Sequence, residues 1–375
     1  MSHPIRVLIA DKSSAMRRVV SETLSRAGGI DVIGAACDGR EALSLTHDLK
    51  PDVVILDNDL PGLTGEEVLR LLRASQPKLP IIMFSSLSLR GIDATFHSLS
   101  SGATDFVAKP VAAGHVLQAV RHIESQLLPK VQHWGSLKLG RFVVPGTETT
   151  AHTQRQLPVR PSVPTKSAAR GRPQRIEAVV MGISTGGPNA LAEVVPKFPA
   201  DLGVPILIVQ HMPPMFTRLL AERLDQLGPL SVREAVPQAE VRPGQIWIAP
   251  GDYHMTVRRQ GDRVLIDTNQ NERENSCRPS ADVLFRSAAE VWGGNMLGVI
   301  MTGMGKDGLE GCRCIRPLGA NIVCQDEASC VVWGMPRAVT EAGLADHIVG
   351  LKNMADEIVR QVRIANKTLV PAGAV

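Results

Sequence analysis

A serine in a glycine-rich turn is the first residue whose surroundings suggest chemistry. Residues 182–186 read Gly-Ile-Ser-Thr-Gly and follow an apolar run of strand length. The glycines allow a tight turn between a strand and a helix, which leaves the hydroxyl of Ser184 exposed above the sheet edge. This pattern predicts a nucleophile. A phosphate-binding glycine loop is the alternative, but neither the G-x-G-x-x-G spacing nor a lysine after the glycines occurs here.

A serine nucleophile needs a base and an acid that orients the base. His211 directly follows the apolar run 205–209, and Asp307 lies in the glycine-rich segment 301–308 after another apolar run. We expect His211 to take the serine proton and Asp307 to fix its tautomer, while backbone N–H groups around Met304 face an oxyanion. The order Ser, His, Asp differs from that of chymotrypsin-like, subtilisin-like and α/β-hydrolase enzymes, which argues against those folds.

Four polar residues in the first part of the chain form a second candidate site. Asp11, Asp57, Ser85 and Lys109 each follow or end an apolar run. Carboxyl ends of parallel strands meet at one edge of a sheet, so we expect these side chains to converge. The set suits phosphoryl transfer to Asp57, with Ser85 and Lys109 binding phosphoryl oxygens and Asp11 and Asp57 holding a hard divalent cation. Simple solvation of strand ends is the alternative for any one of them.

The first 125 residues show an alternation of strands and helices that would position these four polar residues. A helix is expected after Ser13 or Ser14, which can cap it, and before Gly28 and Gly29, which can end it. Short apolar runs recur about every 25 residues with helical patterns between them, which predicts a doubly wound parallel sheet. The expected strands are Ile5–Ala10, Val32–Ala36, Val53–Leu56, Ile81–Phe84 and Phe106–Ala108.

A proline-rich, basic segment separates this region from a second α/β region. Residues 128–175 are expected to be a linker, because prolines recur and Lys and Arg far outnumber acids there. We therefore expect domains at 1–127 and 176–370. The second domain is predicted to contain a parallel sheet. Its expected strands are Ala178–Ile183, Pro205–Val209, Ile246–Ala249, Val264–Ile266, Leu297–Thr302 and Asn321–Cys324.

Composition excludes several classes of function. The formal charge of the 375 residues is only +4, and aromatic residues make up 3%, so no nucleic-acid surface is expected. Six cysteines without a C-x-x-C pair indicate reduced thiols in a cytoplasmic protein rather than a disulfide framework or zinc site. No apolar run is long enough to span a membrane. We expect a monomer that needs no cofactor for catalysis.

Five ordered motifs resemble those of the chemotaxis methylesterase family CheB. They are GISTGGPNAL at 182–191, QHMPPMFT at 210–217, IAPGDYH at 248–254, CRPSADVLF at 277–285 and MTGMGKDG at 301–308. In addition, ILDNDLPGLTG at 55–65, the Lys109-Pro110 pair and the five βα units resemble a flavodoxin-like two-component receiver domain. Together the two resemblances cover roughly residues 4–350.

The resemblance implies roles for individual residues. In the second domain Ser184 is the nucleophile, His211 the general base and Asp307 the orienting acid, and Thr185 and the backbone of Met304 support the oxyanion. His254 and Arg278 occupy matching motif positions, where a substrate contact and a structural role are both open. In the receiver, the resemblance makes Asp57 the phosphorylated residue, Ser85 the switch hydroxyl and Lys109 the lysine of the site.

The same resemblance implies an activity and its partners. The expected reactions are hydrolysis of glutamate γ-methyl esters on the cytoplasmic helices of chemoreceptors, which releases methanol, and deamidation of receptor glutamines. Phosphorylation by a chemotaxis histidine kinase is expected to relieve inhibition by the receiver. The alternatives are a phosphorylation-independent methylesterase and a non-enzymatic receiver with a binding module.

One residue departs from the receiver pattern. Receivers carry two adjacent acids after the first strand, whereas this chain reads Asp11-Lys12. Mg²⁺ prefers carboxylate ligands, so a lysine at the second position is expected to weaken its binding. Lys12 could stand in for the cation or point outward, and these two alternatives are open on the sequence alone.

Overall fold

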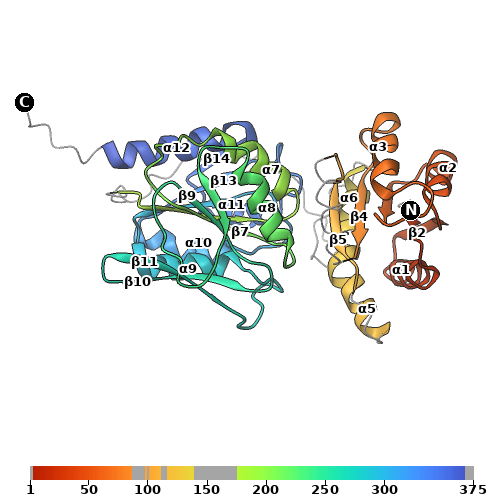
Figure 1. Ribbon diagram of the computed structural model, residues 1–375, viewed down its shortest axis with the longest axis horizontal. Coiled ribbons are helices and arrows are strands. Elements are labelled where there is room, and N and C mark those ends of the chain that lie inside the picture. The colour runs from red at the N-terminus through yellow and green to blue at the C-terminus, as the bar shows by residue number, and fades with distance from the viewer. Residues whose placement is uncertain (1–2, 87–97, 99–100, 111–115, 139–174, 368–375) are drawn as a thin grey trace, which may run out of the picture. The chain divides into compact units, whose positions relative to one another are not determined.

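The computed structural model describes residues 3–86, 98, 101–110, 116–138 and 175–367, which divide into two compact units (Figure 1). The first unit holds β1 to α6 and the second β6 to α12. No helix among the described residues is both long and apolar enough to cross a membrane.

The first unit is built on a five-stranded parallel sheet with the strand order β2-β1-β3-β4-β5. All five predicted strands are confirmed. β1 has β2 on one side and β3, β4 and β5 on the other, so the chain runs to both sides of its first strand, as a doubly wound fold requires. The strands are β1 Ile5–Ala10, β2 Ile30–Ala36, β3 Val53–Leu56, β4 Ile81–Ser85 and β5 Asp105–Ala108.

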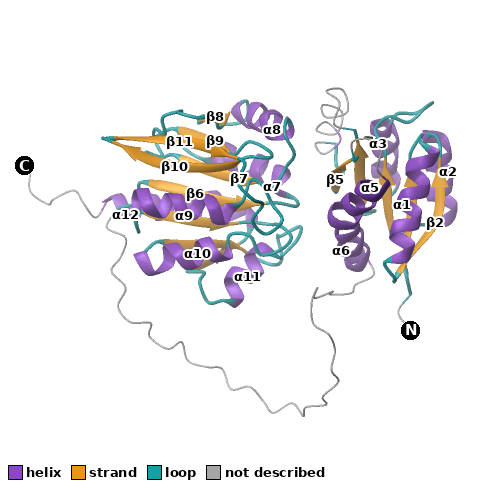
Figure 2. Cartoon of the chain, turned by 90° about the horizontal axis from the view of Figure 1, so that it is seen from below, coloured by secondary structure: helices purple, strands orange, loops and turns teal. Residues whose placement is uncertain are grey.

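Helices cover both faces of this sheet (Figure 2). Side chains of α1, the π-helical turn and α6 join the strands in one core on one face, while α2 and α3 pack against each other on the opposite face. The elements are α1 Ser14–Arg26, α2 Gly39–Leu49, α3 Gly65–Ser75, α5 Val116–His122, the π-helical turn Ile123–Leu127 and α6 Leu128–Lys138.

The expected limits of the first helix agree with the structure. The side chain of Ser13 accepts a hydrogen bond from the backbone N–H of Met16, which satisfies one of the free donors at the start of α1. The helix ends at Arg26, ahead of Gly28 and Gly29, whose φ angles of 72° and 70° are readily adopted by glycine. Local sequence is enough to set these limits.

The linker predicted from residue 128 begins later than expected, because α6 belongs to the first unit. Val131 is fully buried in the core, and Gly135 packs so closely that an added Cβ would lie 2.2 Å from a methyl group of Ile5. Lys130 pairs with Asp105 at 2.6 Å. The basic composition suggested a solvated linker, but the segment forms a helix in which Lys130 binds Asp105 of β5. The remainder of the predicted linker, 139–174, lies outside the described residues.

The second unit contains a seven-stranded, all-parallel sheet with the order β14-β13-β12-β6-β7-β9-β8, and a separate antiparallel hairpin, β10–β11. The predicted parallel sheet is confirmed, but the predicted strand at 264–266 belongs to the hairpin, and β8, β10 and β14 were not expected. The strands are β6 Ala178–Ile183, β7 Ile206–Gln210, β8 Ser231–Glu234, β9 Gln245–Ile248, β10 His254–Gln260, β11 Arg263–Asn269, β12 Met296–Ile300, β13 Asn321–Gln325 and β14 His347–Val349.

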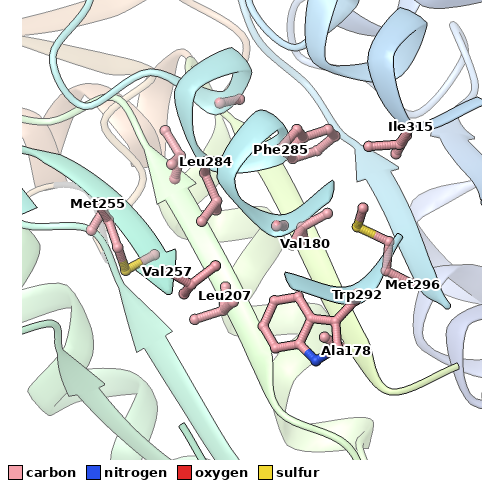
Figure 3. Close-up of a cluster of buried hydrophobic side chains, with 14 of the residues drawn as sticks. Ala178, Val180, Leu207, Met255, Val257, Leu284, Phe285, Trp292, Met296 and Ile315 are labelled. Carbon is pink, nitrogen blue, oxygen red and sulfur yellow. The ribbon is translucent and has the colours of Figure 1, made fainter. Parts of the chain in front are cut away.

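A large apolar core lies between one face of this sheet, the hairpin and the helices α9, α10 and α11 (Figure 3). Val180 and Leu207 from the sheet, Val257 from the hairpin, and Phe285 and Trp292 from α9 are all buried there. Burying each large side chain contributes about 1.5–3 kcal/mol, so α9 is held firmly against the sheet. The helices are α7 Gly187–Val194, α8 Phe216–Asp225, α9 Ala281–Trp292, α10 Leu309–Ile315, α11 Met335–Glu341 and α12 Leu351–Lys367, with 3-10 turns at Val195–Lys197 and Arg316–Leu318.

Candidate active site

Three neighbouring strands bring the predicted triad to one edge of the second sheet. Ser184 follows β6 and His211 follows β7, and the last residues of these strands, Ile183 and Gln210, are paired in register. Asp307 lies in the loop after β12, on the other side of β6. The chain leaves β6 towards β7 and later returns beside it as β12. The site is therefore at a topological switch point, where open α/β sheets bind ligands.

Ser184 is held by its backbone in the turn predicted from the glycine pattern. Its N–H donates to the carbonyl of Thr302 at 3.0 Å, and its carbonyl accepts from the N–H of Gly187 at 2.8 Å. A Cβ on Gly303 would lie 2.8 Å from the Cβ of Ser184, so only glycine leaves room for the serine. Gly186 has a φ of 80°, which permits the sharp entry into α7.

His211 is tied to Asp307 as predicted. Nε2 of the ring donates to Oδ2 of Asp307 over 2.8 Å, and Nδ1 lies 3.6 Å from Sγ of Cys277. Among the described residues, no hydrogen bond joins the hydroxyl of Ser184 to this ring. Burial opposes a charged imidazolium, whereas the charges and hydrogen bonds of Cys277 and Asp307 favour it and raise the pKa of His211 above its usual value.

The carboxylate of Asp307 is fully enclosed and contacts the N-terminus of α9. Besides His211, it accepts hydrogen bonds from the backbone N–H of Ala281 at 2.6 Å, the hydroxyl of Ser280 at 2.7 Å and the side-chain amide of Asn275 at 3.0 Å. Burial alone would raise its pKa, yet His211 and these donors hold the pKa well below its usual range. The positive end of the α9 dipole favours the same charged state.

Two further residues position the site and were not assigned a role from the sequence. The side-chain amide of Gln210 donates to the carbonyls of Ser184 at 2.9 Å and His211 at 3.3 Å, so it ties the two strand ends together. Ser280 holds Asp307 as described above. Both lie inside recognised motifs, and a polar residue ending a buried apolar strand, as Gln210 does, is the signal that could have indicated its role.

The expected oxyanion residues lie beside the serine. Thr185 is buried, and its carbonyl accepts from the hydroxyl of Thr302 at 2.9 Å, which connects the serine turn to the loop after β12. Met304 is half-buried in that loop. A Cβ on Gly334 would lie 3.2 Å from the Cα of Met304, so the backbones pack closely there. These contacts hold the serine turn and the loop after β12 together.

Of the two alternatives for His254 and Arg278, the geometry favours structure over substrate contact. His254 is buried, its Nδ1 accepts from the N–H of Ser280 at 3.2 Å, and its Nε2 bonds to the carbonyl of Glu272 at 2.9 Å. Arg278 pairs with Asp252 at 2.8 Å. Both side chains hold the loop around the predicted triad, and every nitrogen of the His254 ring and of the Arg278 guanidinium has a protein partner.

The first unit brings the second predicted group together. Asp11 and Asp57 are both buried at the sheet edge, and Nζ of Lys109 lies 2.7 Å from a carboxylate oxygen of each. Ser85 ends β4 in the same buried edge. Burial raises the pKa of Asp57, and the ammonium of Lys109 partly offsets that effect.

Lys12 points to an exposed acid at the rim of this group. Its ammonium forms an ion pair with Asp59, and both side chains are more than half exposed. The backbone N–H of Asp59 donates to Oδ1 of Asp57 at 3.1 Å, so the pair lies next to the carboxylate predicted to accept a phosphoryl group. The nearby charges of Asp59, Asp57 and Asp11 all favour the protonated form of Lys12.

Each of the two units matches the model of a known protein family. Residues 7–121 match the response regulator receiver domain model, and residues 179–358 match the CheB methylesterase model. A protein-glutamate methylesterase/protein-glutamine glutaminase of Trichodesmium erythraeum is 43% identical over 95% of this chain and 99% of its own length. One from Nocardioides is 41% identical over 99% of both.

A solved structure of the Thermotoga maritima CheB methylesterase catalytic domain is 39% identical, covers 49% of this chain and 98% of its own, and has a TM-score of 0.49. The identities with the two full-length relatives extend through both units of the chain. The chain belongs to the CheB methylesterase family, with a response regulator receiver domain ahead of the methylesterase domain.

Proposed function

We propose that this chain hydrolyses glutamate γ-methyl esters on chemoreceptors, releasing methanol, and deamidates receptor glutamines, releasing ammonia. The observation that carries the proposal is the bond between His211 and the enclosed Asp307, formed beside the Ser184 turn at the switch point of the sheet. The relatives bear the name of both activities. The two reactions are one class of acyl transfer with different leaving groups.

The geometry suggests how each residue acts. Ser184 Oγ attacks the acyl carbon. The neutral form of His211 keeps its proton on Nε2 for Asp307, so Nδ1 is the ring nitrogen that takes the serine proton. The ring then gives this proton to the departing methanol or ammonia. Backbone N–H groups near Thr185 and Met304 stabilise the oxyanion. Water next attacks the acyl-enzyme by the same path, and no cofactor is needed.

The receiver site does not suit a tightly bound divalent cation. The buried carboxylates of Asp11 and Asp57 share the one ammonium of Lys109, which leaves a single net negative charge. Lys12 stands where a second acid would supply a ligand. The remaining acid at the rim, Asp59, is paired with Lys12. We propose that Asp57 accepts a phosphoryl group with Lys109 and Ser85 binding its oxygens, and that any Mg²⁺ binds weakly.

We further propose that the chain acts as a monomer in the cytoplasm on chemoreceptor helices, with a histidine kinase as phosphoryl source. The receiver then occupies residues up to 138 and the methylesterase domain begins near 176, with the intervening residues as linker. A non-enzymatic binding module is the alternative, and methanol release decides between the two.

A small acyl phosphate should increase methanol release by wild type at least about fivefold, because phosphorylation of Asp57 shifts the population towards the active form. Asp57→Asn should give the same rate with and without the donor. The measurement is the initial rate of methanol release from a methylated chemoreceptor fragment. Asp31→Asn, at an exposed acid of β2, is the matched control and should respond as wild type does. A wild type that ignores the donor would instead indicate a phosphorylation-independent methylesterase.

Lys12→Asp should bind Mg²⁺ at least about tenfold more tightly than wild type. The substitution replaces a positive charge near Asp11 and Asp57 by a carboxylate, and each 1.4 kcal/mol of electrostatic gain corresponds to tenfold in affinity. Isothermal titration of the full chain with MgCl₂ measures the affinity directly. Lys12→Gln, which removes the charge without adding a ligand, should fall between the two. Equal affinities for all three proteins would mean that Lys12 does not control the site.

A further inference from the structure

Cys277 lies against the proposed base of the triad. Its Sγ is 3.6 Å from Nδ1 of His211, and the opposite nitrogen of that ring donates to Asp307. A thiol, an imidazole and a carboxylate therefore contact one another in the order that activates a nucleophile. The thiol is half-buried, so a small reagent can reach it. The esterase mechanism makes no use of this sulfur.

A tight turn fixes Cys277 in that position. Glu274 and Cys277 exchange backbone hydrogen bonds of 3.1 and 2.8 Å, and the residues between them, Asn275 and Ser276, have φ angles of 52° and 62°. Left-handed backbone at a serine is uncommon and persists only where surrounding contacts hold it. The side-chain amide of Asn275 bonds to Asp307, which joins the turn to the acid of the triad.

The other cysteines lack these surroundings. Burial raises the pKa of Cys312 strongly and those of Cys324 and Cys330 to about 12, so these thiols stay neutral. In Cys37, a hydrogen bond with Glu41, burial and nearby acids raise the pKa of the thiol. Cys314 is exposed and provides an internal reference for ordinary thiol reactivity.

We propose that Cys277 is a reactive thiol, and that its oxidation or alkylation blocks His211 and stops ester hydrolysis. Nδ1 of His211 is within reach of the thiol proton, and it is the same nitrogen that must receive the proton of Ser184. A group added to Sγ enters the 3.6 Å gap in front of this nitrogen. The thiol would react with small electrophiles or peroxides, a different class of compound from the receptor ester that Ser184 is proposed to attack.

With a peroxide, the step balances as follows. His211 takes the proton of the thiol, Sγ attacks one peroxide oxygen, and the O–O bond breaks. The departing hydroxide takes the proton held by His211, so the products are a sulfenic acid and water. Sulfur is oxidised and peroxide is reduced. A second thiol, such as dithiothreitol, restores the sulfhydryl by way of a mixed disulfide.

Labelling tests the reactivity without reference to esterase activity. The full chain is treated with limiting iodoacetamide at pH 7, and peptide mass spectrometry follows each cysteine over time. Cys277 should be alkylated at least about tenfold faster than Cys314 in the same molecule, although it is the less exposed of the two. His211→Ala should remove that advantage. Labelling of Cys314 as fast as Cys277 in wild type would overturn the proposal.

Peroxide inactivation tests the consequence, which rests on the proposed function. Hydrogen peroxide should lower methanol release by wild type at least about tenfold, with recovery in dithiothreitol. Peroxide should inactivate the matched control Cys314→Ser as much as wild type. Cys277→Ser should release methanol at the same rate with and without peroxide. Equal inactivation of Cys277→Ser and wild type would overturn the proposal. Untreated protein that releases no methanol would contradict the proposed function alone, because the labelling result stands independently.

Discussion

The Ser184→Ala variant is expected to release methanol from a methylated chemoreceptor fragment at least about 10⁴-fold more slowly than wild type. The substitution removes the only atom proposed to bond to the acyl carbon and leaves the backbone contacts of the turn intact, because both use main-chain groups. The fold should therefore survive, and binding of the fragment should change little. Methanol release and fragment affinity, measured on the same preparation, check both statements.

A serine on the opposite edge of the same sheet provides the control. Ser231 begins β8, away from the carboxyl ends of the strands, and Ser231→Ala should keep the wild-type rate. Equal methanol release by Ser184→Ala and wild type would exclude Ser184 as the nucleophile. No release by folded wild type from a validated fragment would favour the non-enzymatic binding module instead.

Asp307→Asn is expected to lower kcat by about 10³–10⁴-fold with little change in KM, because Asp307 touches the base and not the substrate. An amide oxygen in place of Oδ2 can still accept from His211 and Ala281. Its NH₂ group then faces the side-chain amide of Asn275 and the backbone N–H of Asp282, which donate to Oδ1 in the wild type. At least one buried donor is left poorly paired, which should cost roughly 1–3 kcal/mol in the free energy of unfolding. Steady-state kinetics and chemical denaturation measure the two effects separately.

The pH dependence of stability distinguishes this carboxylate from others. Since the folded-state pKa of Asp307 is lowered, its stabilising contribution is present above the unfolded pKa of about 3.9 and is lost as the pH falls below that value. Asp307→Asn should flatten this acid limb, whereas Asp262→Asn, at the exposed hairpin turn, should leave it unchanged. An identical acid limb in Asp307→Asn and wild type would contradict the charge assigned to this residue.

Local patterns accounted for most of the elements that carry the sites. The runs ending at Ala10, Ile183 and Val209 predicted β1, β6 and β7 because each is apolar, of strand length and followed by a turn signal. Edge strands were harder to see, since β8 and β14 are only partly buried and bear charged or polar residues. The helix α6 was missed for a related reason, as its lysines hide a buried face that includes Val131.

By itself, the sequence determined that a serine turn, a histidine and an aspartate follow strands of one domain, and that two aspartates and a lysine do so in another. Those are local features, set by residue type and spacing. Only the tertiary structure decided which ring nitrogen of His211 meets Asp307, that Cys277 lies at the other nitrogen, and that Lys12 pairs with Asp59. These contacts join residues 47 to 96 positions apart, so they depend on strand order and burial rather than on any local pattern.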